Sequence, residues 1–187
     1  SDIHGKNHHV HGTFGAHVEA ITLVLGDGTV VRTTREQHAD LFLATIGGMG
    51  LTGHIVDVTF RMAKVPSPWI YEESERFGCL EDVFSALNQA SEDWPMTVAW
   101  VDTSLKGAAA GRGIVMRGRW AEPSEAPAHV PRLKQGPVVP DLFPSWVMNR
   151  WSIGLLNWLW WHKHPRKAVS HVIAPEAWFW QLDLLQL

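Results

Sequence analysis

Two prolines separated by one residue, Pro66 and Pro68, constrain the fold of this 187-residue sequence more than any other feature. A proline fixes φ and removes a backbone donor, and the residue before it is pushed toward extended backbone, so regular pairing stops there. We therefore expect a boundary at residues 64–68, between one unit over residues 1–63 and a second over residues 67–187. Because 45% of the residues are hydrophobic, the chain can bury a core.

The first unit has the pattern of strands with one short helix. Residues 20–25 and 29–33 are rich in β-branched and apolar side chains and flank Gly26-Asp27-Gly28, a combination typical of a hairpin. A short helix is expected over residues 36–43, and the alternation over residues 54–62 predicts another strand.

The second unit reads as strand, helix, strand and strand. Strands are expected at residues 69–73, 96–101 and 114–120, and apolar residues at three- and four-residue spacing predict an amphipathic helix over 80–90. This order indicates an α+β fold with an antiparallel sheet in the second unit. Six prolines exclude a long regular element from residues 121–144, and residues 146–180 form a Trp-rich segment.

Charge and composition exclude several classes of function. The formal net charge of −3 gives no basic field of the kind that attracts nucleic acid, so we expect no nucleic-acid partner. A single cysteine, Cys79, excludes an intrachain disulfide. The longest nearly apolar run, residues 153–161, is far shorter than the roughly 20 residues that a membrane-spanning helix needs, so we expect no such span. Cytoplasmic and peripheral membrane locations both stay open.

Four histidines lie near the start of the chain: His4, His8, His9 and His11. Imidazole is a common zinc ligand, but Gly5 and Gly12 are expected to break the helix that would bring His4 and His8 onto one face. We therefore expect no metal site. The alternative for His8, His9 and His11 is that backbone hydrogen bonds satisfy them in a turn-rich loop.

A glycine-dense turn spans residues 47–53, Gly-Gly-Met-Gly-Leu-Thr-Gly. It fits neither the dinucleotide fingerprint nor the phosphate loop. Such clusters are often only tight turns, but they also allow close backbone approach to a ribityl or pyrophosphate chain. Both interpretations stay open from the turn alone.

Taken jointly, several motifs resemble those of FAD-linked oxidases of the vanillyl-alcohol-oxidase superfamily. The clearest are the run over residues 2–9, then Gly12-Thr13-Phe14-Gly15, Asp40-Leu41-Phe42 and the turn over 47–53. Thinner matches continue at Ala99-Trp100, Asp102, Arg117-Gly118-Arg119, residues 140–144 and Trp160. The resemblance therefore touches most of the chain, with high specificity only in residues 2–60.

This resemblance implies an FAD site and assigns residues to it. The residues implied in cofactor binding are Ser1, Asp2, Ile3, His4, Gly5, Gly48, Gly50 and Ile55. His4, Lys6 and Trp100 are implied to line the substrate side, although Val98 stands where the relatives have serine. Lys6 is implied as the catalytic residue, because a lysine near the flavin N1–C2=O edge would stabilise the anionic reduced ring.

The implied reaction is hydride transfer from a secondary alcohol, of a sugar or a lipid-linked sugar as in cell-wall synthesis, to flavin N5. A reductase partner is left open. In this superfamily the pyrophosphate-binding segment would precede Ser1 and further catalytic residues would follow Leu187, so we expect a fragment of a longer enzyme that is inactive and empty alone. The first unit would be the later part of an FAD-binding domain, and the second the opening part of a substrate domain.

The Trp-rich segment leaves a different class of function open, a non-catalytic binding or membrane-apposed module. Its tryptophans are Trp146, Trp151, Trp158, Trp160, Trp161, Trp178 and Trp180. They could pack into the core, form a belt at a lipid surface beside Lys163, Arg166 and Lys167, or form a cage for a small ligand.

Overall fold

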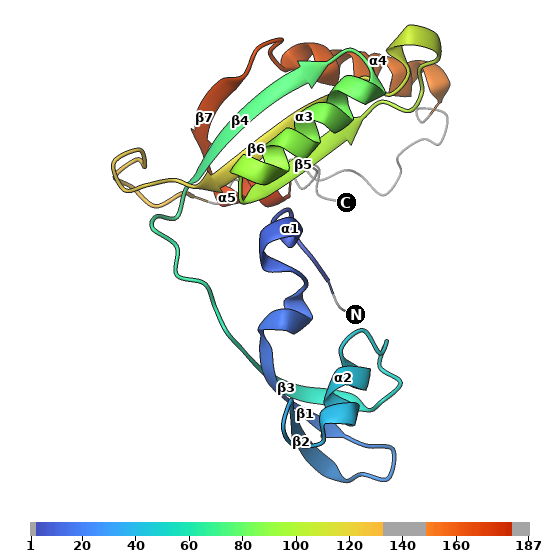
Figure 1. The fold of residues 1–187 in the computed structure, drawn as a ribbon, viewed down its shortest axis with the longest axis vertical. Helices are drawn as coiled ribbons and strands as arrows, with labels where there is room; N and C mark the ends of the chain where they lie inside the picture. The colour runs from blue at the N-terminus through green and yellow to red at the C-terminus, as the bar shows by residue number, and fades with distance from the viewer. Residues whose placement is uncertain (1–2, 133–148, 181–187) are drawn as a thin grey trace. The chain divides into compact units, whose positions relative to one another are not determined.

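The computed structural model describes residues 3–132 and 149–180 of the chain (Figure 1). It divides into two compact units, Ser1–Lys64 and Val65–Leu187, and the division falls beside Pro66 and Pro68. Both units combine helices with antiparallel strands. The α+β class predicted from the sequence is therefore confirmed.

The first unit contains a three-stranded sheet in the order β2-β1-β3. Its elements are α1 (His8–His11), a 3-10 turn (Phe14–His17), β1 (Val18–Val24), β2 (Val30–Thr34), α2 (Ala39–Thr45) and β3 (His54–Phe60). The predicted hairpin is confirmed, since β1 and β2 pair antiparallel from Val24↔Val30 outward. Its turn is stabilised by the Asp27 side chain, which accepts a hydrogen bond from the Thr29 amide at 2.9 Å.

One helix covers the core of this sheet. Val18, Ile21 and Leu23 of the central strand β1 pack with Phe42 of α2, and all four are buried. The edge strand β3 is different, because most of its residues are exposed. The core of the first unit therefore depends mainly on β1 and α2.

The second unit contains a four-stranded antiparallel sheet in the order β5-β6-β4-β7. Its elements are β4 (Ile70–Phe77), α3 (Leu80–Asp93), β5 (Met96–Val101), a 3-10 turn (Gly107–Ala109), β6 (Gly113–Trp120), α4 (Arg150–Lys163), β7 (Val169–Ile173) and α5 (Pro175–Phe179). The predicted strands and the predicted helix α3 are confirmed. The described part of the 121–144 excursion, residues 121–132, holds no helix or strand, while residues 133–144 lie outside the described residues.

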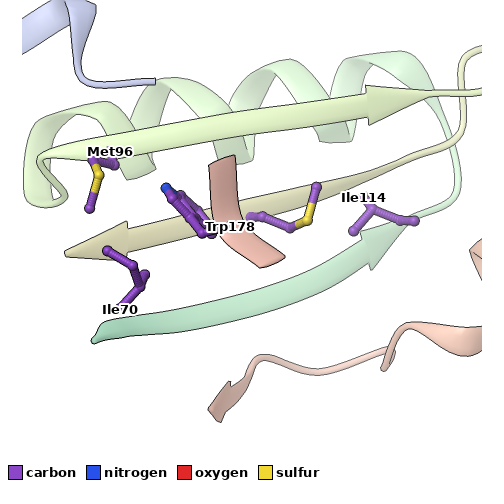
Figure 2. Close-up of a cluster of buried hydrophobic side chains, with 5 residues drawn as sticks. Ile70, Met96, Ile114 and Trp178 are labelled. Carbon is purple, nitrogen blue, oxygen red and sulfur yellow. The ribbon is translucent and has the colours of Figure 1, made fainter. Parts of the chain in front are cut away.

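The two faces of this sheet carry separate apolar clusters. Helix α3 lies along one face of the sheet (Figure 1). On that face, Val83 and Ala90 of α3 pack with Val115 of β6. The opposite face carries Ile70, Met96, Ile114, Met116 and Trp178, and Figure 2 shows the Trp178 indole among its neighbours. A Cβ on Gly118 would lie 2.9 Å from the Trp178 ring. Glycine at position 118 therefore gives the indole room to lie against β6.

Helix α4 was not predicted, and its N-terminus shows why it forms. The Asn149 side chain accepts hydrogen bonds from the amides of Trp151 and Ser152, and the Ser152 hydroxyl accepts one from the Asn149 amide at 3.1 Å. This reciprocal capping box satisfies amides that have no partner inside the helix. Because apolar residues surround this helix on all sides, its sequence shows no clear helical period.

The tryptophans of the Trp-rich segment divide between core and surface. Trp178 is buried, and Trp160 and Trp161 pack against the same cluster. Trp151 and Trp180 are 75% and 56% exposed, and Trp158 is 48% exposed. The prediction that these tryptophans pack into the core is therefore confirmed for Trp160, Trp161 and Trp178 but not for the three exposed ones. Among the described helices, none combines the length and the apolar character needed to cross a membrane.

Candidate functional site

The opening motif forms a small loop closed at its base. The Ile3 carbonyl accepts a hydrogen bond from the Phe14 amide at 2.7 Å, and His4 pairs with Thr13 in an isolated bridge. Between these contacts the chain makes the single helical turn α1, which ends at Gly12 with φ of 69°. The loop therefore holds residues 3–13 as one closed structure. Ser1 and Asp2, both predicted to contact the cofactor, lie outside the described residues.

The predicted flavin-contacting residues of this loop lie at the surface. The Ile3 side chain is 62% exposed, and His4 and Gly5 are exposed as well. Lys6 is half-buried. A large exposed apolar side chain beside exposed backbone and a cation is the kind of surface that an aromatic ring system can cover.

The histidines of this loop contact one another. No helix joins His4 to His8, as Gly5 predicted, since α1 begins at His8; their rings nevertheless meet edge to face with centroids 4.9 Å apart. The reason is that residues 8–11 form a helical turn while the bridge to Thr13 carries His4 back beside it. His17 Nε2 lies 3.0 Å from the His11 carbonyl. Within residues 3–132 and 149–180, no three His, Cys, Asp or Glu side chains gather in a group that could hold a metal ion.

Three of the four glycines in the turn after α2, Gly48, Gly50 and Gly53, differ in why glycine suits the position. A Cβ on Gly48 would collide with the Ala44 carbonyl of α2, and one on Gly53 would lie 2.7 Å from the Val24 carbonyl of β1. Gly50 has φ of 80°, and a Cβ there would meet no atom within 4 Å. Gly48 and Gly53 therefore allow the turn to pack closely against α2 and β1, whereas the space beside Gly50 is open.

The two parts of the predicted site attach to opposite ends of the β1–β3 pair. The Phe14 ring of the opening loop contacts Phe60 at the end of β3, with centroids 5.2 Å apart. The glycine turn leads instead into His54, the first residue of β3, which pairs with Val24. Six residue steps along a strand span roughly 20 Å. A ligand that contacts both parts must therefore be elongated.

Apolar side chains are exposed around the glycine turn. Met49 and Leu51 are 80% and 86% exposed. Ile55, which was predicted to pack against the flavin, pairs with Leu23 on β1 and is 45% exposed. Exposed apolar side chains that lie close together, as Met49 and Leu51 do in this turn, are typical of a surface that binds a ligand or a partner.

Trp100, the predicted substrate residue, lies in the second unit. It is half-buried and packs, together with Val98, against the cluster that contains Trp178. The Trp100 indole therefore has a packing role on the face that α5 covers.

A buried polar network in the second unit was not assigned any role from the sequence. Asp102 at the end of β5 is 1% exposed and accepts hydrogen bonds from the Ser104 amide at 3.0 Å, from Arg112 at 3.1 Å and from Asn157 of α4 at 2.9 Å. Burial raises the pKa of Asp102, but the hydrogen bonds from Ser104, Arg112 and Asn157 outweigh it, so the pKa lies below its ordinary value. The network joins β5, the loop before β6 and α4. The spacing Asp102-x-Ser104 was a local signal of a turn, but no sequence signal connects it to Asn157.

Trp161 of α4 lies beside this network between two guanidinium groups. The guanidinium carbons Cζ of Arg76 and Arg112 lie 4.2 Å and 4.7 Å from the centre of the Trp161 ring. Trp161 also donates a hydrogen bond to the Phe77 carbonyl at 3.3 Å. These contacts hold one side of α4 on the sheet.

A second charged pair lies where β6 leads into the loop that follows it. Both oxygens of Glu125 accept hydrogen bonds from Arg119 at 2.7 Å, and the Glu122 amide donates another at 2.9 Å. The hydrogen bonds from Arg119, with that from Glu122, lower the pKa of Glu125 to about 2. Glu125 therefore stays ionised well into the acid range.

Comparison with known proteins finds relatives that align with most of this chain. No protein-family model matches the chain. It is 32% identical over 173 residues to the decaprenylphosphoryl-beta-D-ribose oxidase of Mycolicibacterium smegmatis, covering 87% of this chain and 37% of that enzyme. It is also 34% identical over 184 residues to an uncharacterized protein in the mprA 5' region of Streptomyces coelicolor, covering 91% of this chain and 49% of that protein. The chain thus spans less than half the length of these curated relatives.

Proposed function

We propose that the protein to which this chain belongs is an FAD-linked oxidase of the vanillyl-alcohol-oxidase superfamily that oxidises a secondary alcohol of a sugar or lipid-linked sugar. The observation that carries this proposal is the 32% identity to decaprenylphosphoryl-beta-D-ribose oxidase, which extends over 173 residues. An identity spread over that length and over both units is hard to explain by a shared turn or strand alone. The relative's name supplies the chemical class, oxidation of a ribose derivative.

The residues assigned to FAD are compatible with such a group. Of the described ones, Ile3 to Gly5, Gly50 and Ile55 are exposed and Gly48 is half-buried, and no side chain fills the space at Gly50. Their separation along the β1–β3 pair suits an elongated dinucleotide better than a compact ligand. In this proposal the loop over residues 3–6 faces the reactive end, and the turn at Gly48 and Gly50 faces the phosphate chain.

When bound, FAD would accept the hydride of the alcohol carbon at N5 while the hydroxyl proton leaves to a base, so that the CH–OH group becomes a ketone. The role we assign to Lys6 is electrostatic. A lysine ammonium at the pyrimidine edge of the ring favours the negative charge that reduction creates there. His4 and Gly5, next to it in the loop, would hold the sugar against the ring.

The proposal is tested on the full-length gene product by flavin absorbance and anaerobic reduction with sugar alcohols. We expect bound FAD that bleaches when a ribose-containing alcohol is added. A colourless protein that takes up no added FAD would overturn the proposal.

A substitution separates the role of Lys6 from simple binding. We expect Lys6→Ala to retain flavin and to slow its reduction by about a hundredfold, the loss typical of removing one electrostatic stabiliser. Lys64→Ala, at the end of the same unit and outside the assigned residues, is the matched control and should reduce at the unchanged rate. Equal rates in the Lys6 variant and the control would remove Lys6 from the mechanism.

A further inference from the structure

One side of α4 is committed to the sheet. Asn157 donates to Asp102, Trp161 lies between two arginines, and Trp160 packs against the buried cluster. These residues recur at three- and four-residue spacing, so they share one face of the helix. The helix is therefore held in a defined orientation.

The opposite side of α4 exposes apolar side chains. Trp151 is 75% exposed, Leu155 58%, Trp158 48% and Leu159 50%. Their spacing also follows the helical repeat, so they form one continuous stripe that we call the outer stripe of α4. Isolated exposed apolar residues are common, but an ordered stripe with two tryptophans indicates a surface that binds something.

Cations lie at both ends of α4 and in the loop after it, and residues 149–175 contain no acidic residue. Arg150, Lys163, Arg166 and Lys167 are exposed. The Arg150 guanidinium lies 4.7 Å from the centre of the Trp151 ring, and Lys163 Nζ lies 5.0 Å from that of Trp160. Since the whole chain has a net charge of −3, this concentration of cations is local.

From these observations we infer that the outer stripe of α4 docks on the surface of an anionic phospholipid bilayer, with the helix lying in the plane of the interface. Indole rings favour the headgroup region of a bilayer, and lysine and arginine beside them meet lipid phosphates. The inner contacts of α4 keep it folded on the sheet while the outer stripe enters the interface. This inference does not depend on the redox proposal.

A second copy of the chain fits this surface less well. Antiparallel pairing of two α4 helices would bring Lys163 of one copy near Arg150 of the other, and the segment offers no carboxylate to compensate the repulsion. Like charges placed opposite each other oppose association. A bilayer with anionic headgroups presents the complementary charge.

The first test is co-sedimentation of the full chain with vesicles of phosphatidylcholine, with and without phosphatidylglycerol. We expect binding that requires phosphatidylglycerol and that weakens as salt concentration rises. Binding that is absent, or equal on both kinds of vesicle, would overturn the inference. This measurement on the unmodified chain remains decisive even if a variant fails to fold.

The second test replaces apolar residues of the outer stripe. Because Leu155 and Trp158 are about half exposed, Leu155→Ser with Trp158→Ser is expected to weaken vesicle binding at least about tenfold. Phe84→Ser is the matched control, since Phe84 is 56% exposed on the other long helix of the same unit, and it should bind like the unmodified chain. Equal binding of the double variant, or an equal loss in the control, would refute the role of the stripe.

The third test removes charge. Each basic residue near an anionic membrane contributes about fivefold in affinity, so Lys163→Gln, Arg166→Gln and Lys167→Gln together should cost about a hundredfold. A control that removes three cations of the first unit, Arg32, Arg61 and Lys64, should change binding little. Sedimentation velocity without lipid is the remaining check. A dimer that the Leu155 and Trp158 substitutions dissociate would show that a second copy occupies the stripe, and the lipid inference would fail.

Discussion

Removing the Asp102 carboxylate is expected to destabilise the second unit and to loosen α4. Asp102 is 1% exposed, and its main cationic partner Arg112 is 13% exposed, so the pair is largely shielded from water. Asp102→Ala leaves the Arg112 guanidinium, and the Asn157 amide of α4, without their acceptor. Breaking a buried ion pair from one side costs about 3–5 kcal/mol.

The lower end of that range is expected, because Arg112 retains some contact with water. A loss of about 3 kcal/mol should lower the melting temperature by roughly 10 °C for a unit of this size. Asp102→Asn keeps the shape and an acceptor oxygen but not the charge, so its cost should be smaller. The sign of the pH dependence follows from the lowered pKa of Asp102. The stabilisation is present above the ordinary value of 3.8 and is lost as the pH falls through the lower pKa of the folded state.

Urea unfolding followed by tryptophan fluorescence measures this effect selectively. All 11 tryptophans lie at or after position 69, so the signal reports on the second unit alone. Hydrogen exchange in α4 should accelerate in Asp102→Ala and, to a smaller extent, in Asn157→Ala. Asp93→Ala, an exposed acid at the end of α3, is the control and should stay within about 0.5 kcal/mol of the unmodified chain. A cost below about 1 kcal/mol for Asp102→Ala would refute the argument that this network holds α4.

Three further outcomes follow from close contacts. Gly118→Ala should cost about 1–3 kcal/mol, because the new methyl group would press on the Trp178 ring at 2.9 Å, and a shift in tryptophan fluorescence with the urea midpoint would show it. The Glu125 carboxylate should titrate at about 2 by NMR, so its stabilising contribution is lost on acidification from the ordinary 4.5 toward 2, and Arg119→Gln should restore a value nearer 4.5. Gly53→Ala should destabilise the first unit, because φ is 148° and the methyl group would approach the β1 backbone, and circular dichroism melting is the check.

Elements whose signals lie in adjacent residues were predictable from the sequence. The hairpin of β1 and β2 follows from Gly26-Asp27-Gly28, and α3 follows from a one-sided apolar period. Helix α4 escaped prediction because its residues are apolar on both sides, and only its Asn149 cap carried a local signal. Strand β7 is short and is specified by its place beside β4 rather than by alternation.

The candidate site was predictable as a set of motifs but not as an arrangement. The sequence pointed to Lys6 and to the glycine turn, and their assigned roles stay predictions. It did not show that Gly48 and Gly53 are required by contacts with α2 and β1. It also did not show that the His4 and His8 rings meet, because the bridge that brings them together is made by Thr13, nine residues farther along.

By itself, the sequence determined the α+β class, the break beside Pro66 and the local turns, because these depend on backbone preferences of neighbouring residues. Only the tertiary structure decided which side of α4 faces the sheet, since that choice rests on Asn157 meeting Asp102 across 55 residues of chain. The same structure leaves Trp158 outside while it places Trp161 between two arginines. Contacts between residues so far apart depend on chain topology, which apolar periodicity does not encode.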